Sequence, residues 1–296
     1  MRLIEQQSEY LPQTNGIEGV YKHIELCGRT CYKSTDKITN NSAKPFVDRL
    51  INLGHCSMLE HGTIYLKRKM DYSDFDYNTF EGFYEQNPYS KVVYDRGLCY
   101  VSTNFRIIIE HHLLEDLKYM CEPCEYHEKR YTFRCITSIG VTREMNRHRV
   151  NSIAEQSTRY CNYSKDKFGN ELTFIKPCWF DSSLIDDTGN WDANTFYRIP
   201  TQSIEESAFL GTLLSAEKSY FNLLECGWQP QQAREVLPLS TATEIIHTAF
   251  ASDWKHFFDL RLYGKTGAPH PNMKQLAELM KEEAEKAHIW EDIIKY

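Results

Sequence analysis

The sequence lacks the features of several special classes of protein. No apolar stretch approaches the roughly 18 residues of a membrane span, and one of the longest uncharged stretches, residues 207–216, has ten. The N-terminal residues MRLIEQQSEYLPQ contain no apolar core of a secretion signal. Cysteine is scarce and scattered, with ten among 296 residues, which suits a reducing compartment. We therefore expect a soluble protein of the cytoplasm, or of the host cytoplasm if the source is a virus.

Positive charge is also in short supply. The sequence has 34 Lys and Arg against 41 Asp and Glu, a net charge of −7, which argues against a general nucleic-acid coat. Hydrophobic residues (41%) and charged residues (25%) are close to the globular average, which argues against disorder, collagen and coiled coil. A chain of this length buries about three quarters of its unfolded surface. We expect one domain spanning residues 1–296.

The N-terminal half mixes helical and strand patterns. Residues 17–27 follow a helical period, and a second helix is expected from Ser42 to Gly54, burying Phe46, Leu50 and Leu53. Three strands are expected, at residues 63–67, 98–109 and 131–136. Residues 70–94 read as irregular, and residues 69–130 as an insertion.

Three helices are expected in the C-terminal half. Capping boxes at Ser203/Glu206 and Thr241/Glu244 predict one helix ending at Gly227 and another running towards Leu262. Pro271 suits the first turn of a last helix, which extends to Trp290. Because strands and helices do not alternate regularly, an α+β fold is favoured.

The most informative segment is TREMNRHRVNSIAEQSTRY, residues 142–160. From Arg143 onward it holds four arginines and two glutamates, and guanidinium groups grip phosphate oxygens in pairs. If residues 142–149 are helical, Arg143 and Arg147 share a face and Arg149 points about 200° away from Arg147. An extended chain after Asn151 would place residues 155, 157 and 159 on one side. The alternative is a surface helix with ordinary ion pairs, such as Arg143 with Glu155.

Arg147, His148 and Arg149, followed by seven residues and Ser157, spell RHR-x7-S, the signature of the flavin-dependent thymidylate synthases. The chain resembles this family in further blocks that occur in the same order. They are GRTCYKS (28–34), LGHCSMLEH (53–61), REVLPL (234–239), HFFDLRL (256–262) and APHPNMKQLA (268–277). Residues 69–130 have no counterpart in compact members of the family.

The resemblance implies a twisted, mostly antiparallel sheet packed with helices, in a homotetramer with active sites shared between chains. It implies reductive methylation of deoxyuridylate (dUMP) to thymidylate (dTMP). FAD mediates the hydride transfer, and NADPH and 5,10-methylenetetrahydrofolate are co-substrates. Neither nucleic acid nor a membrane is expected as a partner.

Site residues follow position by position from the resemblance. The implied cofactor-binding residues are Ser57, Arg147, His148, Arg149, Glu155 and His256. The implied substrate-binding residues are Glu144, Arg147, Glu155, Gln156, Ser157, Thr158, Arg159, Arg234 and Arg261.

Arg261 is the expected catalytic residue. Uracil C5 is a weak nucleophile, and a fixed cation beside the ring stabilises the negative charge that spreads over N3 and the carbonyl oxygens. Ser157 is a possible nucleophile, but no base is assigned to it, so we prefer a ligand-binding hydroxyl. The chain departs from the family at Cys31, at Glu144 and at residues 250–252, where Phe-Ala-Ser replaces an Asn-x-Arg flavin contact.

Other residue patterns allow competing hypotheses. Cys121, Cys124 and His127 resemble half of a zinc site, and His55, Glu60 and His61 resemble a metallohydrolase motif with the wrong spacing. No metal is expected. Gly264-Lys265-Thr266 lacks the first glycine of a phosphate loop and reads as a helix-end turn. Cys178 lacks the Pro-Cys-His context of folate-only thymidylate synthases and reads as structural.

A non-enzymatic hypothesis rests on the aromatic residues of the insertion. Their rings could stack on single-stranded nucleic acid or a partner protein, although the neighbouring acidic residues oppose a phosphate backbone; a cover at the edge of a tetramer is the alternative. These aromatics are Tyr72, Phe75, Tyr77, Phe80, Phe83, Tyr84 and Tyr89.

Overall fold

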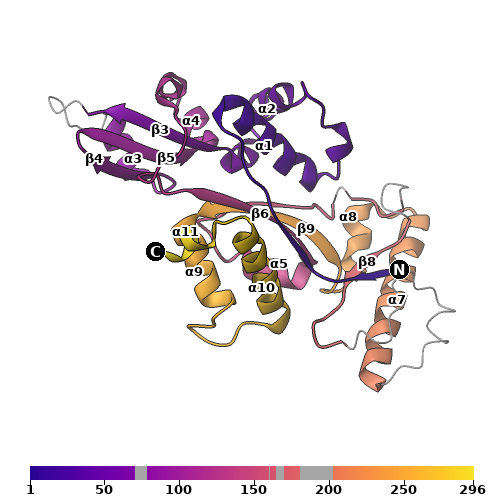
Figure 1. Cartoon of the computed structure of the whole chain (residues 1–296). Helices are drawn as coiled ribbons and strands as arrows, with labels where there is room; N and C mark the ends of the chain where they lie inside the picture. Colours follow the sequence, from indigo (N-terminus) through magenta and orange to yellow (C-terminus); the bar gives the residue numbers. More distant parts are fainter. Residues whose placement is uncertain (71–78, 160, 165–169, 181–202) are drawn as a thin grey trace.

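A computed structural model describes residues 1–70, 79–159, 161–164, 170–180 and 203–296. Its centre is a four-stranded antiparallel sheet in the order β2-β6-β9-β7 (Figure 1). These strands are β2 (Gln7–Tyr10), β6 (Arg130–Ser138), β9 (Ala242–Phe250) and β7 (Ser152–Glu155).

Helices cover both faces of the central sheet (Figure 1). On one face, α9, α10 and α11 bury a core that includes Phe133, Trp254 and Met280. On the other face, α1 packs Cys27 against Ile246 of β9. The helices are α1 (Gly16–Cys31), α9 (Ala251–Arg261), α10 (Pro271–Lys286) and α11 (Trp290–Ile294).

A second antiparallel sheet, in the order β3-β5-β4, is built mainly from residues 69–130. It shares an apolar core with α1, α2 and the helices that follow its strands. The elements are α2 (Ala43–Asn52), η2 (Cys56–His61), β3 (Thr63–Lys69), α3 (Phe80–Gln86), β4 (Lys91–Asp95), β5 (Leu98–Asn104), α4 (Phe105–Glu110) and η3 (Leu114–Tyr119).

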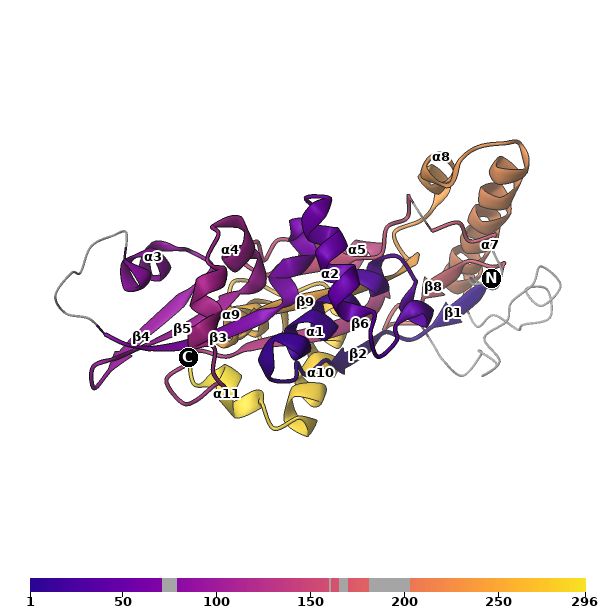
Figure 2. The ribbon, with the colours of Figure 1, turned by 90° about the horizontal axis from the view of Figure 1, so that it is seen from above.

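The opposite end of the elongated molecule carries a short parallel pair of strands beside α7 (Figure 2). Its elements are β1 (Arg2–Ile4), β8 (Thr173–Ile175), α7 (Ile204–Glu225), α8 (Pro230–Ala233) and η6 (Arg234–Val236). In the part of the chain that the structure describes, every helix is too short or too polar to cross a bilayer.

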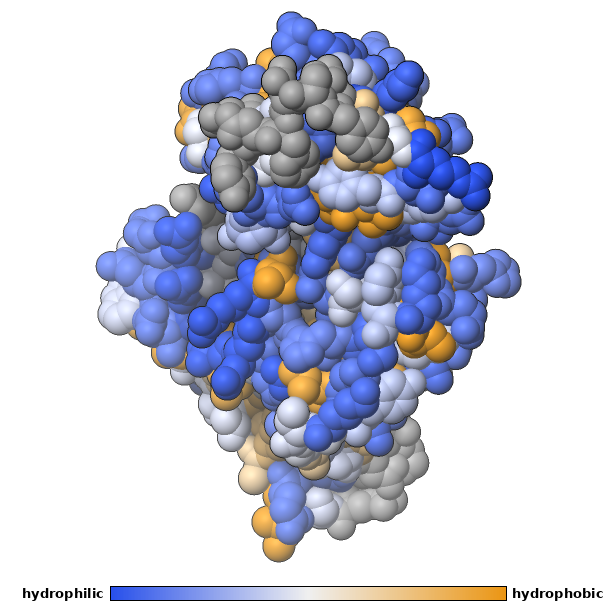
Figure 3. All heavy atoms as spheres, turned by 90° about the vertical axis from the view of Figure 1, so that its left-hand side faces the viewer, coloured by the Kyte–Doolittle hydropathy of each residue, from blue (hydrophilic) through white to orange (hydrophobic). Residues whose placement is uncertain are grey.

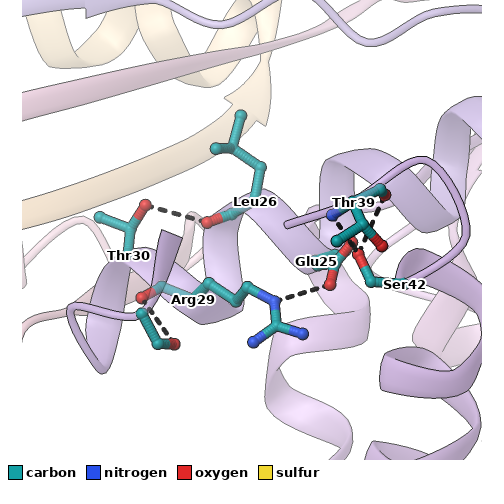
Figure 4. A network of polar contacts seen from close by, with 7 residues as sticks. Glu25, Leu26, Arg29, Thr30, Thr39 and Ser42 are labelled. Atoms are coloured by element: carbon teal, nitrogen blue, oxygen red, sulfur yellow. Dashed lines mark hydrogen bonds and ion pairs between the residues drawn. The ribbon is translucent and has the colours of Figure 1, made fainter. Parts of the chain in front are cut away.

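A buried carboxylate fixes α1 against α2 (Figure 4). Glu25 is 1% exposed and accepts hydrogen bonds from Arg29 Nε at 2.6 Å and from Ser42 Oγ at 2.8 Å. The Arg29 guanidinium also lies 4.8 Å from the centre of the Phe46 ring. Arg29, which belongs to the GRTCYKS block, is therefore a packing and ion-pair residue in this chain.

The α+β prediction is confirmed, as are several element ends. Gly54 and Gly227 end their helices with positive φ (68° and 92°), and the Ser203 hydroxyl caps α7 by accepting from Glu206 N at 3.1 Å. Leu53, however, is 59% exposed rather than buried, because it lies in the C-cap position of α2, where the chain leaves the core.

The predicted helix from Thr241 towards Leu262 is wrong over its first half. Residues 242–250 form β9, the strand between β6 and β7. Eight of its nine residues are buried, and β-branched side chains suit a strand covered on both faces. Only α9, from Ala251, is helical.

Two predictions in the insertion are also corrected. The strand expected over residues 98–109 stops at Asn104, whose side chain accepts a hydrogen bond from Ile107 N at 3.2 Å and starts α4. Residues 70–94 are not wholly irregular, since they contain α3 and most of β4.

The aromatic residues of the insertion do not gather on one exposed surface. Phe80 and Tyr84 are buried, whereas Tyr89 is half exposed. The molecular surface at this end is mainly hydrophilic, with apolar residues in small separate patches (Figure 3). Tyr72, Phe75 and Tyr77 lie outside the described residues. The predicted stacking surface is therefore wrong for the two buried rings.

Candidate functional site

The arginine-rich segment runs from the end of α5 (Ile139–Met145) through a turn at residues 146–151 into β7. Ser138 caps α5, its hydroxyl accepting from Val141 N at 3.3 Å. The helix ends at Met145, not at Arg149, because Asn146 begins a turn in which His148 N bonds to Met145 O at 3.0 Å. The expected shared helical face of Arg143 and Arg147 is therefore wrong.

Arg261, the last residue of α9, reaches back to this turn. Its Nη1 donates to Glu144 Oε2 at 2.8 Å, its Nη2 to the Glu144 carbonyl at 3.0 Å, and its Nε to His148 Nε2 at 3.2 Å. A guanidinium carries five N–H groups. Three are used here, so one on each terminal nitrogen remains for a ligand.

His148 is a neutral, oriented ring. It is 7% exposed, and burial, with the nearby Arg261 and His256, lowers its pKa to about 4. Because Arg261 Nε–H can only donate, His148 Nε2 must accept, which places the ring proton on Nδ1. The ring packs against Phe257 at 5.0 Å and lies 5.9 Å from His256.

A cavity of about 670 Å³ opens beside these residues. Arg147 and Arg149 are exposed on its wall, and within the described residues no carboxylate lies in ion-pair distance of either. The volume lies within the usual range of small-molecule sites, and unpaired guanidinium forks suit a diphosphate. The donor set therefore fits the phosphates of FAD. The lining includes Glu144, Arg147, His148, Arg149, His256 and Arg261.

Glu155 links this cavity to the next predicted residues. Thr142 Oγ1 donates to its Oε1 at 2.9 Å, and Asn146 Nδ2 to its Oε2 at 3.2 Å. β7 ends at Glu155, so the expectation that residues 155, 157 and 159 line one side of a strand is wrong. The chain turns at residues 158–159.

The remaining predicted substrate residues form a second cluster. Arg234 Nη1 donates to Thr158 Oγ1 at 3.0 Å, and Ser157 N donates to Cys31 O at 3.3 Å. Gln156 is buried and lines a separate cavity of about 350 Å³. Arg159 is exposed and does not line the Arg261 cavity. One chain thus unites Arg147 and Arg261, but not Arg159.

Ser57 also lies apart from the Arg261 cavity. It is exposed on η2, a segment that packs against α1 and β7, and it is not among the residues that line that cavity. Its implied contact with the flavin is therefore not made through this cavity of a single chain.

Sequence reasoning missed part of the cavity wall. Val150, Asp253 and residues 266–270 line it. Gly264 has φ of +65°, which agrees with the predicted helix-end turn. That turn carries residues 266–270 to the cavity, and APHP within the resembling block was the available signal.

The predicted metal-like groups have other partners. His127 Nε2 lies 3.1 Å from Leu66 O, and its Nδ1 accepts from Cys124 N at 3.2 Å. Glu60 accepts from Arg106 Nη1 at 2.5 Å, and His61 Nδ1 bonds to Thr248 Oγ1 at 2.8 Å. Among the described residues, no group of three His, Cys, Asp or Glu side chains could hold a metal ion. Cys178, read as structural, is exposed.

The fold and this cavity define an α+β protein with a cationic site suited to a phosphorylated ligand. The model of the family "thymidylate synthase complementing protein" (Thy1) matches residues 123–288, more than half of the chain. The chain therefore belongs to this family, which confirms the resemblance found in the sequence.

Two curated relatives are similar to parts of the chain. A flavin-dependent thymidylate synthase of Thermosipho melanesiensis is 30% identical over 131 residues, 44% of this chain and 53% of the relative. A probable flavin-dependent thymidylate synthase of Paramecium bursaria Chlorella virus 1 is 28% identical over 142 residues, 47% and 60% of the two chains. The chain thus spans between half and two thirds of the length of these relatives.

Solved structures of low identity cover nearly the whole chain. The UMP/dUMP methylase PolB from Streptomyces cacaoi, bound with 5-Br dUMP, is 17% identical with a TM-score of 0.46 over 100% of this chain and 96% of that one. Thymidylate synthase X from Helicobacter pylori, with FAD and dUMP, is 16% identical with a TM-score of 0.39 over 99% of both chains. Likeness at this level does not define ligands.

Proposed function

We propose that the chain is a flavin-dependent thymidylate synthase that methylates dUMP to dTMP. FAD is the cofactor, 5,10-methylenetetrahydrofolate is the carbon donor and NADPH is the reductant. Membership of the Thy1 family and the names of the curated relatives support this activity. The observation that carries it is the Arg261 guanidinium, held by Glu144 and His148 at the edge of a cationic cavity.

Arg261 acts as an electrostatic activator of the uracil ring. Three of its N–H groups fix its plane, and the two that remain can donate to N3 and a carbonyl oxygen as negative charge develops there. Glu144 and His148 are positioning residues for Arg261, and both also line the cavity.

The flavin, when bound, supplies the redox chemistry. Arg147 and Arg149 would hold its phosphates, and His148 Nδ1–H and His256 would contact the rest of the cofactor. Glu155, which joins the Arg147 turn to the Gln156 segment, would lie between cofactor and nucleotide. Ser57 would contact the flavin from another copy of the chain.

The dUMP phosphate needs a second cationic group. The second cluster offers such a group and consists of Ser157, Thr158, Arg159 and Arg234. It lies apart from the Arg261 cavity of the same chain. A homotetramer that places this cluster of one copy against the Arg261 cavity of another would complete the site, with Gln156 at the join. Such an enzyme works in the cytoplasm, without nucleic acid or a membrane.

The test is a flavin spectrum of the purified protein, followed by dUMP-dependent NADPH oxidation with methylenetetrahydrofolate. Arg261→Lys keeps the charge but loses the fork, and it should lower kcat at least about 100-fold, as loss of an oriented electrostatic donor does. Arg143→Lys, an exposed change on α5 outside the cavity, is the matched control. A protein that binds no FAD and oxidises no NADPH refutes the proposal.

A further inference from the structure

A small cavity adjoins the Arg261 cavity and shares Val150 and Asp253 with it. It measures about 70 Å³. One water needs roughly 10–15 Å³ by this kind of measure, so the cavity takes a group of about five heavy atoms, the size of a phosphate. Its wall includes residues of β4, β5, β6, β7, β9 and α9, and the insertion supplies Pro88, Tyr89, Lys91 and Asn104.

Arg130 is the buried cation of this small cavity. It is 9% exposed, yet its terminal nitrogens donate only to neutral acceptors: Glu60 O at 2.9 Å, Thr63 Oγ1 at 3.3 Å and Ser152 Oγ at 2.9 Å. Its Nε is buried without a hydrogen-bond partner. Burying a charge without a contacting counter-ion is costly, so Arg130 offers an unmatched charge and a spare donor.

Lys91 adds a second cation at the same place. Arg130 and Phe250 are paired across β6 and β9, and the Arg130 guanidinium lies 5.3 Å from the centre of the Phe250 ring, with Lys91 Nζ at 5.6 Å. Within the described residues neither cation has a carboxylate in ion-pair distance. Asp253 is the one acidic side chain of the lining, which leaves a formal balance of +1.

We propose that Arg130 and Lys91 form an anion subsite that extends the Arg261 cavity and binds a phosphate group of a dinucleotide cofactor. Asp253, on the wall common to both cavities, accepts a hydrogen bond from a sugar hydroxyl of the same ligand. Tyr89, half exposed at the rim, offers a ring to the base. The insertion thereby becomes part of the ligand site. The choice of a dinucleotide rests on the proposed function.

FAD and NADPH are both dinucleotides that carry phosphate groups, and binding measurements show which of them uses the subsite. The variant Lys91→Gln is compared with Lys91→Arg and with Lys69→Gln, a matched control at an exposed residue that ends β3 of the same sheet. Losing one charge-assisted contact should raise the Kd of FAD roughly tenfold. Riboflavin, which has no phosphate, should bind all variants equally, and Lys91→Arg should restore FAD binding.

If the phosphate belongs to NADPH, FAD binding by Lys91→Gln stays unchanged and the KM for NADPH rises roughly tenfold instead. Unchanged FAD affinity together with unchanged KM overturns the subsite. Arg130→Lys, checked for folding by circular dichroism, should weaken the same ligand as Lys91→Gln, and a loss of the other ligand instead contradicts a shared subsite.

The subsite and the proposed function fail in different ways. If FAD binding depends on Lys91 but the protein shows no dUMP-dependent turnover, the subsite stands and the proposed function is refuted. If Lys91→Gln leaves turnover and cofactor binding unchanged, the proposed function stands and the subsite is refuted. A protein that binds neither FAD nor NADPH overturns both.

Discussion

Acid is expected to destabilise the fold, because three histidines are buried as neutral rings around the central sheet. Burial lowers the pKa of His23 to about 4 and that of His247 to about 3, and holds the pKa of His61 well below its usual value. On the α1 side, His23 and His61 each bond to a threonine hydroxyl, Thr132 and Thr248, at 2.9 and 2.8 Å. The two hydroxyls are 2.8 Å apart.

The magnitude follows from proton linkage. In the unfolded chain each ring titrates near pH 6.5. Below that pH the unfolded state therefore binds more protons than the folded state, which lowers the free energy of unfolding. The stabilisation is complete above about pH 6.5 and is lost as the pH falls towards the folded pKa. At pH 5 each ring loses about 2 kcal/mol, and His23 and His247 together roughly 4 kcal/mol. Domains are stable by only about 5–15 kcal/mol.

Urea unfolding at pH 7.5 and pH 5.0 measures this loss. Trp254, with its ring 6.2 Å from His247, supplies a fluorescence signal from the core. His23→Gln should lower stability at pH 7.5 but reduce the pH slope by up to about 1.4 kcal/mol per unit. His55→Gln, an exposed change, should leave the slope unaltered. A wild-type stability that is flat from pH 7.5 to 5, or an unchanged slope in His23→Gln, would refute the reasoning.

Three further predictions concern single side chains. Glu144→Gln should lower kcat/KM for dUMP about tenfold, because Arg261 loses the carboxylate charge that holds its Nη1. Glu115→Gln, at a residue that is 92% exposed, is the control. Equal rates for the two variants would contradict the role of Glu144 as an anchor of Arg261. Ser157→Ala should keep kcat within about threefold while the KM for dUMP rises, as expected for one lost hydrogen bond; abolished turnover with intact affinity would instead make Ser157 the nucleophile. Asn104→Ala should cost about 1 kcal/mol of unfolding free energy by removing the cap of α4, Asn104→Asp should largely restore it, and no difference between the two would contradict the cap.

Many helices and strands could be predicted from the sequence, because at most elements the local pattern agrees with the tertiary packing. Residues 17–27 show a helical period, residues 203–227 show a helical pattern and a capping box, and both segments are helices. The pattern failed at Thr241/Glu244, where a capping motif precedes a strand. Glu244 is instead a buried carboxylate that receives Lys33 Nζ at 2.7 Å and the Nε of Arg134. Partners from α1's end and β6 lie far away in sequence, so no local window could reveal them.

The sequence named candidate site residues but did not show how the chain arranges them in space. RHR-x7-S marks Arg147 and Ser157 as neighbours along the chain, yet the turn after α5 and the end of β7 separate them: Arg147 lines the Arg261 cavity and Ser157 does not. Arg261 joins Arg147 because α9 begins where β9 ends and runs back along the core. The sequence, in which residues 242–262 read as one helix, hid that reversal of direction.

The charge partners of each cation separate structural arginines from candidate binding residues. Arg29 and Arg106 lie within 2.6 Å of carboxylate oxygens, so their charges are neutralised by ion pairs within the chain. Arg147 and Arg130 have no such contact among the described residues, although one is exposed and the other buried. An exposed unpaired arginine is well solvated, and its position on a cavity wall is needed before it suggests a ligand. A buried one must offset a desolvation cost, so Arg130, which no motif marked, is the stronger indication that the site extends beyond the residues named by the family resemblance.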